Sequence, residues 1–182
     1  MLRLLAGYMA LLVVGTTAAF ALFFYRFTRD RLLEQIDSRL LAAAHFAKAA
    51  LPEDFHDRLE DARSVAPTEY ARIVNRHNRL CRQLDLQYIW SCMVVDDTIV
   101  FTTATSPSHE FSQGDHARFF EPHRDPAAFS EVFAQMQVDY SSFRNEWGRG
   151  RMVLVPFRNQ QGKPYCFGAS MSVQDLSEAQ SS

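Results

Sequence analysis

The stretch 88-YIWSCMVVDDTIVFTTATSP-107 decides the fold class of this chain. It contains two runs of β-branched and aromatic residues on either side of Asp96 and Asp97, a pattern that predicts a β-hairpin. The first run, Gln87 to Asp96, is apolar on both of its alternating faces, so we expect a central strand there. The second run covers about Thr98 to Thr103. The rest of the domain therefore has to be arranged around a sheet.

Three more strands are predicted downstream of this hairpin, after a short helix with the sequence AAFSEVFAQM. They cover Val138 to Arg144, Gly150 to Phe157 and Pro164 to Val173. The turns between them, NEWG and QQGK, are short and contain glycine, which is typical of antiparallel neighbours. We therefore expect an α+β domain, a five-stranded antiparallel sheet with helices packed on one face.

Residues 1–26 have the composition of a transmembrane segment. Leu4 to Tyr25 is a run of 22 residues without a charge, and as a helix it is about 33 Å long, against about 30 Å of bilayer hydrocarbon. Ala19-Phe20-Ala21 resembles a cleavage site, which leaves a cleaved signal peptide as the alternative. Because the apolar run continues beyond that point, we predict an uncleaved signal anchor.

A stalk helix is predicted over residues 27–51. Apolar residues recur with alternating steps of three and four, the period of a coiled-coil seam, at Leu33, Ile36, Leu40, Ala43, Ala47 and Ala50. Two partners are open for this stripe: the sheet of the same chain for the distal half, and the same helix of a second chain nearer the membrane. We expect a homodimer through Leu33, Ile36 and Leu40.

The remainder of the chain is assigned to one domain and a tail. A polar connection leads to a second helix, TEYARIVNRHNRLCRQLDL, which Thr68 is expected to cap. The domain covers residues 52–173, and residues 174–182 form a C-terminal tail.

Composition excludes some classes of partner and covalent chemistry. The formal net charge is -2 and the sequence pI about 6.3, so no basic field favours a nucleic acid. The three cysteines, Cys81, Cys92 and Cys166, form no C-x-x-C pair. We expect small buried hydrophobes; a disulfide between Cys92 and Cys166 in an oxidising compartment is the alternative.

The order of these elements resembles that of extracytoplasmic PAS-like sensor domains, also called Cache or PDC domains. The resemblance covers about Phe27 to Val173 and rests on LLEQIDSRLLAAAHFAKAALPEDFHDRL, PTEYARIVNRHNRL, LQYIWSCMVVDDTIVFTTATSP and YSSFRNEWGRGRMVLVPFRNQQGKPYCFGASMSV. Such domains are input modules of bacterial sensor histidine kinases, diguanylate cyclases and chemoreceptors. The resemblance implies a ligand cavity between the sheet and a layer of loop and helix, with signal transfer from the last strand to a second membrane helix.

The resemblance also implies the location of the domain. Arg26, Arg29 and Arg31 follow the span whereas only Arg3 precedes it, and this count alone places the domain in the cytoplasm. The resemblance instead implies a bacterial inner membrane protein with a periplasmic domain, and we follow it. The sequence ends at QDLSEAQSS without a second span or a kinase or cyclase sequence, so the output is expected in a longer chain or in a partner.

We predict that the ligand is a small carboxylate held by arginine and aromatic side chains, because an arginine fork pairs with a carboxylate and an aromatic ring closes over an apolar group. The segment DHARFF resembles an Arg-x-aromatic-aromatic stretch of ligand-binding relatives. The predicted ligand-binding residues are Arg118, Phe120, Tyr140, Trp147, Arg151 and Ser170. Relatives that bind amino acids usually have an Asp on the last strand, where this sequence has Gly168, Ser170 and Ser172, which speaks against amino-acid binding.

No catalytic motif is recognisable, so we expect neither an enzyme nor a cofactor: the sequence has no phosphate-binding glycine loop, no H-E-x-x-H and no G-x-S-x-G. His109, His116 and His123 are spaced by seven residues in a polar segment. Because this is not a recurrent metal-ligand spacing, no metal site is assigned. The leading hypothesis is a membrane-anchored sensory input domain for a small solute. The alternative is a membrane-anchored assembly domain whose sheet docks another protein.

Overall fold

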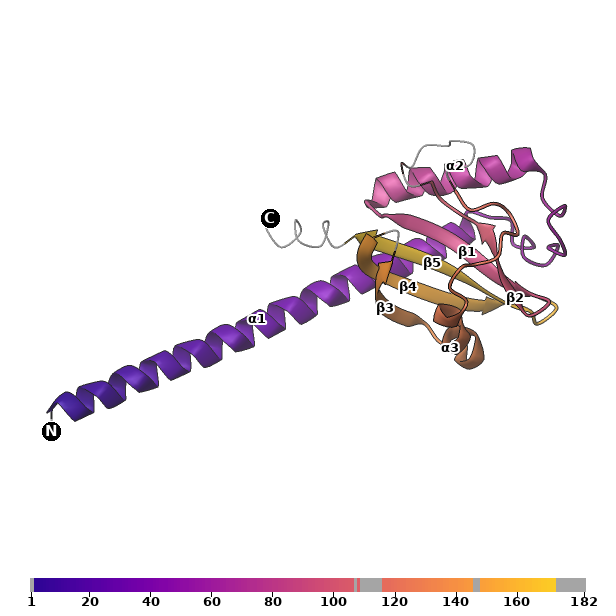
Figure 1. Ribbon diagram of the computed structural model, residues 1–182. Coiled ribbons are helices and arrows are strands. Elements are labelled where there is room, and N and C mark those ends of the chain that lie inside the picture. Colours follow the sequence, from indigo (N-terminus) through magenta and orange to yellow (C-terminus); the bar gives the residue numbers. More distant parts are fainter. Residues whose placement is uncertain (1, 107, 109–115, 146–147, 173–182) are drawn as a thin grey trace. The chain divides into compact units, whose positions relative to one another are not determined.

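The computed structural model describes residues 2–106, 108, 116–145 and 148–172. The elements in this part of the chain follow one another as α1 (Leu2–Ala49), α2 (Pro67–Leu84), β1 (Tyr88–Val95), β2 (Thr98–Thr103), α3 (Ala127–Gln135), β3 (Asp139–Asn145), β4 (Gly148–Arg158) and β5 (Pro164–Ser172) (Figure 1). The predicted α+β class is confirmed, and each predicted strand lies within two residues of its observed bounds.

The chain divides into two compact units, residues 1–38 and residues 39–182. The first unit is the N-terminal part of α1, whose apolar side chains are exposed, as at Leu11 and Phe20. By length and composition this helix can cross a membrane, criteria that a signal sequence also meets. The second unit contains the sheet and the pocket.

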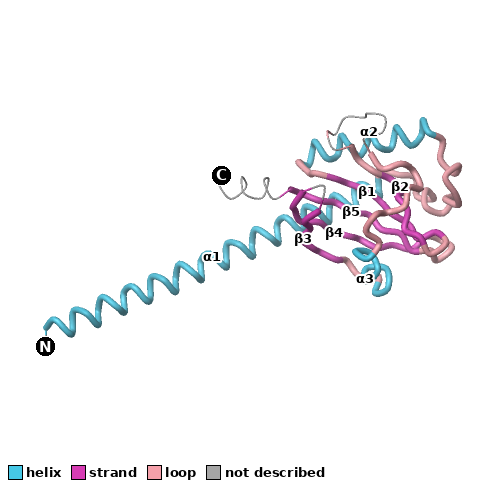
Figure 2. The backbone as a smooth tube through the Cα atoms, in the orientation of Figure 1, coloured by secondary structure: helices cyan, strands magenta, loops and turns pink. Residues whose placement is uncertain are grey.

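The five strands form one antiparallel sheet in the order β2-β1-β5-β4-β3 (Figure 2). β1 lies between β2 and β5, which confirms its prediction as an internal strand. The turn from β1 to β2 consists of Asp96 and Asp97, with φ angles of 48° and 60°. Two successive residues with positive φ are the hallmark of a type I′ hairpin turn, whose twist matches that of the strands.

One side of the sheet, here called the helix face, is closed by the end of α1 and the segment after it. This face carries the buried side chains Ile89, Met93, Val153, Val155, Phe167 and Ala169. Two residues of α1 contact the ring of Phe157. The ring centre of His45 lies 5.8 Å from that of Phe157 in an edge-on arrangement, and Nζ of Lys48 lies 5.2 Å from the Phe157 ring centre. Leu40 of α1 is 0% exposed in this unit. The expectation that Leu40 is available to a second chain is therefore wrong, because the domain's own core covers it.

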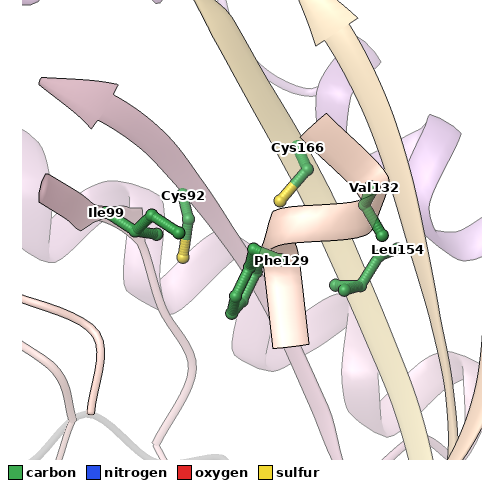
Figure 3. Packing of buried hydrophobic residues seen from close by; sticks show 6 residues of the cluster. All are labelled: Cys92, Ile99, Phe129, Val132, Leu154 and Cys166. Carbon is green, nitrogen blue, oxygen red and sulfur yellow. The ribbon is translucent and has the colours of Figure 1, made fainter. Parts of the chain in front are cut away.

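The other side of the sheet, here called the pocket face, is covered in part by α3. Phe129 and Val132 of α3 pack with Cys92, Ile99, Leu154 and Cys166, as Figure 3 shows. The expectation that all helices pack on one face is thus wrong: α3 places two apolar residues, one helical turn apart, on the side opposite to α1. Apolar periodicity predicts that a helix is covered, not by which face of a sheet.

The three cysteines are free and buried, as predicted for small hydrophobes, and Cys92 lies directly opposite Cys166 across β1 and β5. Burial raises the pKa of the Cys166 thiol to about 12. Thr68 does not cap α2. The N-cap is Ala66, without a side-chain hydrogen bond, and Pro67 occupies the first turn, where its missing N–H and fixed φ are no disadvantage.

Candidate functional site

A pocket of about 840 Å³ lies over the pocket face, between the sheet, residues 116–125 and α3. A volume of this size is in the range of small-molecule sites. Its lining draws on all five strands. The aromatic members of the lining are Tyr88, Trp90, Phe101, Phe119, Phe120, Phe129 and Phe143.

The floor of the pocket is set by the strand register. Tyr88 of β1 and Met152 of β4 both pair with Ser170 of β5, so the three side chains form one row across the sheet. Trp90 follows two residues after Tyr88 and therefore points to the same face. It pairs with Gly168 in the next row. Because all four strand positions face the pocket, alternation along the strands is enough to build its floor.

Gly168 is required by the Trp90 ring. A Cβ atom at residue 168 would lie 2.3 Å from Cε2 of Trp90, closer than non-bonded carbon atoms can come. The space beside Gly168 is thus occupied by the indole ring of Trp90. Of the residues of β5, only Ser170 lines the pocket.

The outer wall is a segment tied to the free edge of β2. The N–H of Phe120 donates to the carbonyl oxygen of Phe101 at 2.8 Å, and the N–H of Phe101 donates to the carbonyl oxygen of Glu121 at 2.9 Å. Between these bonds Phe120 has a φ of 61°, a left-handed conformation that is unfavourable for a bulky side chain. Backbone pairing on both sides holds this conformation and keeps the Phe120 ring in the lining.

Helix α2 anchors the same wall from behind. The hydroxyl of Tyr70 donates to the carbonyl oxygen of Ala117 at 2.7 Å, and its ring centre lies 5.5 Å from that of Phe119. Tyr70 is buried, and this burial raises the pKa of its hydroxyl. The wall is thereby fixed to β2 at one point and to α2 at another.

The charged groups of the lining all come from residues 118–125. They are Arg118, Glu121, Arg124 and Asp125. One carboxylate oxygen of Glu121 accepts the backbone N–H of Arg118 at 2.8 Å, whereas the guanidinium of the exposed Arg118 makes no ion pair with the residues that the structure describes. Burial lowers the pKa of His123, and its Nδ1 accepts the N–H of Asp125 at 3.1 Å. Arg118 is therefore a cation available to an anion at the pocket.

The structure brings three of the predicted ligand-binding residues together in the lining: Arg118, Phe120 and Ser170. Tyr140 and Arg151 do not join them. Tyr140 pairs with Val153, and Arg151 is an immediate neighbour of the pocket-lining Met152, so alternation turns both towards the helix face. Arg151 shares a side with Val153, two residues further along β4, and this is the side away from the pocket. Trp147 lies outside the described residues.

The predicted ligand-binding residues did not include Trp90, Phe101 and Phe143, which line the pocket. The signal that was available is the alternation along β1, which places Tyr88 and Trp90 on the same face. In the sheet they lie opposite Ser170 and Gly168 of β5. For a metal ion, the described residues contain no group of three suitable ligands. His116 and His123 line the pocket, and His109 lies outside the described residues.

Comparison with known proteins supports the fold but not a sequence family. No family model matches the chain, and no curated protein matches its sequence. Among solved structures, the sensor domain of DcuS from E. coli superposes with a TM-score of 0.57 at 10% identity, over 83% of this chain and 98% of that domain.

The ligand-binding domain of the Campylobacter jejuni chemoreceptor Tlp3 has also been solved, in complex with 4-methylisoleucine and with L-valine. These structures give TM-scores of 0.52 and 0.50 at 5% and 6% identity, over 80% of this chain. The chain spans only 54% and 56% of the Tlp3 domain. The predicted similarity to extracytoplasmic PAS-like sensor domains is confirmed at the level of the fold.

Proposed function

We propose that this chain is a sensory input domain without catalytic activity of its own, which binds a small carboxylate in the pocket and passes a signal to an output module. The observation that carries the proposal is a pocket of about 840 Å³ with an available guanidinium, that of Arg118, in its lining. Arginine pairs with carboxylates through two parallel hydrogen bonds. Arg118 takes the role in which Arg151 was also considered, because Arg151 faces away from the pocket.

The positive φ of Phe120 supports the same site. Left-handed conformations of bulky residues are costly and concentrate at functional sites, where the surrounding structure maintains them. The alternative, an assembly domain that docks a protein on its sheet, requires an apolar patch on the exposed surface. In the described part of residues 39–182 only Phe46 and Val138 are large exposed hydrophobic residues, so the solute-binding interpretation is favoured.

The location and the assembly of the chain belong to the same proposal. The N-terminal part of α1 anchors the chain in a bacterial inner membrane, and the domain lies in the periplasm. The homodimer forms through α1 near the membrane, with Leu33 and Ile36 as its candidates, because Leu40 is buried within residues 39–182. Protease treatment of spheroplasts tests the location: a domain that is degraded only after lysis is cytoplasmic.

Thermal unfolding of the full chain in detergent micelles tests the binding site. The probes are aliphatic and aromatic mono- and dicarboxylates, supplied as sodium salts with sodium chloride as the reference. A carboxylate at 100 times its dissociation constant stabilises the fold by about 2.7 kcal/mol. Arg118→Gln should abolish this stabilisation and leave the melting temperature of the unliganded chain unchanged, because Arg118 is exposed.

The matched control is Arg79→Gln, which removes an exposed arginine of α2 outside the pocket lining. This variant should bind as the wild type does. The proposal is wrong if no carboxylate stabilises the wild type, or if both arginine variants bind equally well.

A further inference from the structure

Two polar groups on the pocket floor have no partner, and they specify the chemistry of the solute beyond its carboxylate. Nε1 of Trp90 and Oγ of Ser170 are buried and make no hydrogen bond with the residues that the structure describes. Native proteins pair nearly all buried polar side-chain atoms, so an unpaired atom next to a pocket points to a partner that arrives from outside the chain. This inference rests on the proposed function.

The two groups are neighbours on the same face. Ser170 pairs with Tyr88, and Trp90 is two residues further along β1, a step of about 7 Å. An indole N–H is only a donor, whereas a serine hydroxyl both donates and accepts. One oxygen atom placed between them satisfies both, if it accepts from Trp90 and exchanges a hydrogen bond with Ser170. Hydroxyl and carbonyl oxygens meet this requirement.

The charge distribution of the pocket fixes the direction of the solute. Every charged residue of the lining belongs to residues 118–125, whereas the strands contribute only aromatic, aliphatic and uncharged polar side chains. A carboxylate therefore binds at the wall that carries Arg118, and the part of the solute over the sheet is uncharged. The strands contribute four aromatic residues to that part, Tyr88, Trp90, Phe101 and Phe143, and aromatic rings pack well against a ring.

An aliphatic amino acid fits this floor poorly. Its side chain carries no acceptor for Trp90 Nε1 and leaves Ser170 Oγ without a partner. On the pocket face of β5, Gly168 and Ser170 offer no carboxylate to an ammonium group. The floor therefore favours a different class of carboxylate from the L-valine that the Tlp3 ligand-binding domain holds in its complex.

We propose that the solute is a ring-bearing carboxylate with a hydroxyl or carbonyl oxygen at the end remote from the carboxylate. The carboxylate pairs with Arg118, the ring lies among the aromatic side chains, and the remote oxygen bonds to Trp90 and Ser170. Both side chains border the pocket while their polar atoms are covered. A rotation of each side chain when the solute binds is therefore part of the proposal.

Isothermal titration of the full chain in detergent micelles tests this with two matched pairs of probes. The pairs are 4-hydroxybenzoate with 4-methylbenzoate, and 6-hydroxy-2-naphthoate with 6-methyl-2-naphthoate; succinate and L-valine serve as ring-free probes. Within a pair, only the remote oxygen changes. In at least one pair, the hydroxylated probe should bind about tenfold more tightly than the methylated one, which corresponds to one good hydrogen bond.

Three variants locate the effect. Trp90→Phe keeps a ring but removes the N–H, and should reduce the advantage of the hydroxylated probe to about twofold or less. Ser170→Ala should reduce it as well. The matched control is Ser141→Ala: Oγ of Ser141 is also buried without a partner, and Ser141 lies on the pocket face opposite Met152, but it is not in the lining. This variant should keep the full advantage.

Equal binding of the two members in both pairs, or tighter binding of succinate or L-valine than of every ring compound, overturns this inference and leaves the proposed function intact. The same holds if the advantage survives in Trp90→Phe and Ser170→Ala. If the six probes fail but another carboxylate still binds through Arg118, only this inference is wrong. If no carboxylate binds at all, the proposed function is wrong and this inference is wrong with it.

Discussion

The two faces of the sheet are built from the same five strands, yet they are closed in different ways. On the helix face, Met93, Val153 and Phe167 are fully buried. Thr102, Ser91 and His56 form a paired polar group there: Oγ1 of Thr102 lies 2.6 Å from Oγ of Ser91 and 3.1 Å from Nε2 of His56. The pocket face keeps Trp90, Phe101 and Met152 only partly buried, and leaves two polar atoms of its floor without partners.

This difference shows that strand residues do not by themselves make one face a core and the other a site. Cys92 and Cys166, on the pocket face, are as completely buried as any residue of the helix face, because α3 covers them. The part of the same face that α3 does not cover forms the floor of the pocket. The elements that pack on a sheet therefore decide which part of it stays open as a pocket.

The largest effect is expected from truncating an aromatic residue on the closed face. Phe167→Ala leaves a cavity among rigid neighbours and should lower the free energy of unfolding by about 3–5 kcal/mol. Phe101→Ala, on the pocket face, removes a partly buried ring that already borders an open space. It should cost about 1–2 kcal/mol. Denaturant unfolding of both variants tests the comparison, and equal losses would mean that the pocket is as tightly packed as the core.

Acidification should lower the free energy of unfolding through the buried histidines on the side of α1 and α2. Burial lowers the pKa of His56 to about 3 and that of His77 to about 4, from an ordinary 6.5. The unfolded chain therefore binds protons at a higher pH than the folded chain does. Stability is fully present above pH 6.5 and is lost as the pH falls towards 3, with a slope of up to about 1.4 kcal/mol per pH unit for each histidine.

Melting temperatures between pH 7 and pH 4 measure this slope. His56→Gln removes one titrating group, so its stability should depend less on pH than that of the wild type, whatever its stability at pH 7. His45→Gln, at an exposed histidine of α1, is the control and should leave the slope unchanged. An unchanged slope in His56→Gln contradicts the burial of a neutral imidazole at this position.

The smallest changes in stability are expected when single hydroxyl groups are removed, and they should differ between a paired and an unpaired hydroxyl. Thr102→Val removes the hydroxyl that bonds to Ser91 and His56. It should cost about 1–3 kcal/mol, since both partners stay buried. Ser170→Ala removes a hydroxyl without a partner and should change stability by less than about 0.5 kcal/mol in the absence of a ligand. If Ser170→Ala is as costly as Thr102→Val, Ser170 serves the fold and not a ligand.

The sequence by itself determined the element order, the strand bounds to within two residues, the burial of the cysteines and the long apolar helix. These features follow from local signals: a period of two in strands, a period near 3.6 in helices, and turn residues that accept positive φ, such as Asp96 and Asp97. The resemblance of DHARFF to ligand-binding relatives, and not a local period, led to Arg118 and Phe120, and Ser170 was chosen on the last strand. All three line the pocket.

Only the tertiary structure decided which face of the sheet carries the pocket and which is closed as core. A period of two assigns Arg151 and Val153 to one face and Met152 and Leu154 to the other, but nothing local tells which of these faces α1 covers. That choice depends on contacts between residues far apart in the chain, such as Phe129 with Cys92 and Lys48 with Phe157. For this reason Arg151 was predicted in the pocket although it faces the other side of the sheet, and Trp90, which forms the pocket floor, was not among the predicted residues.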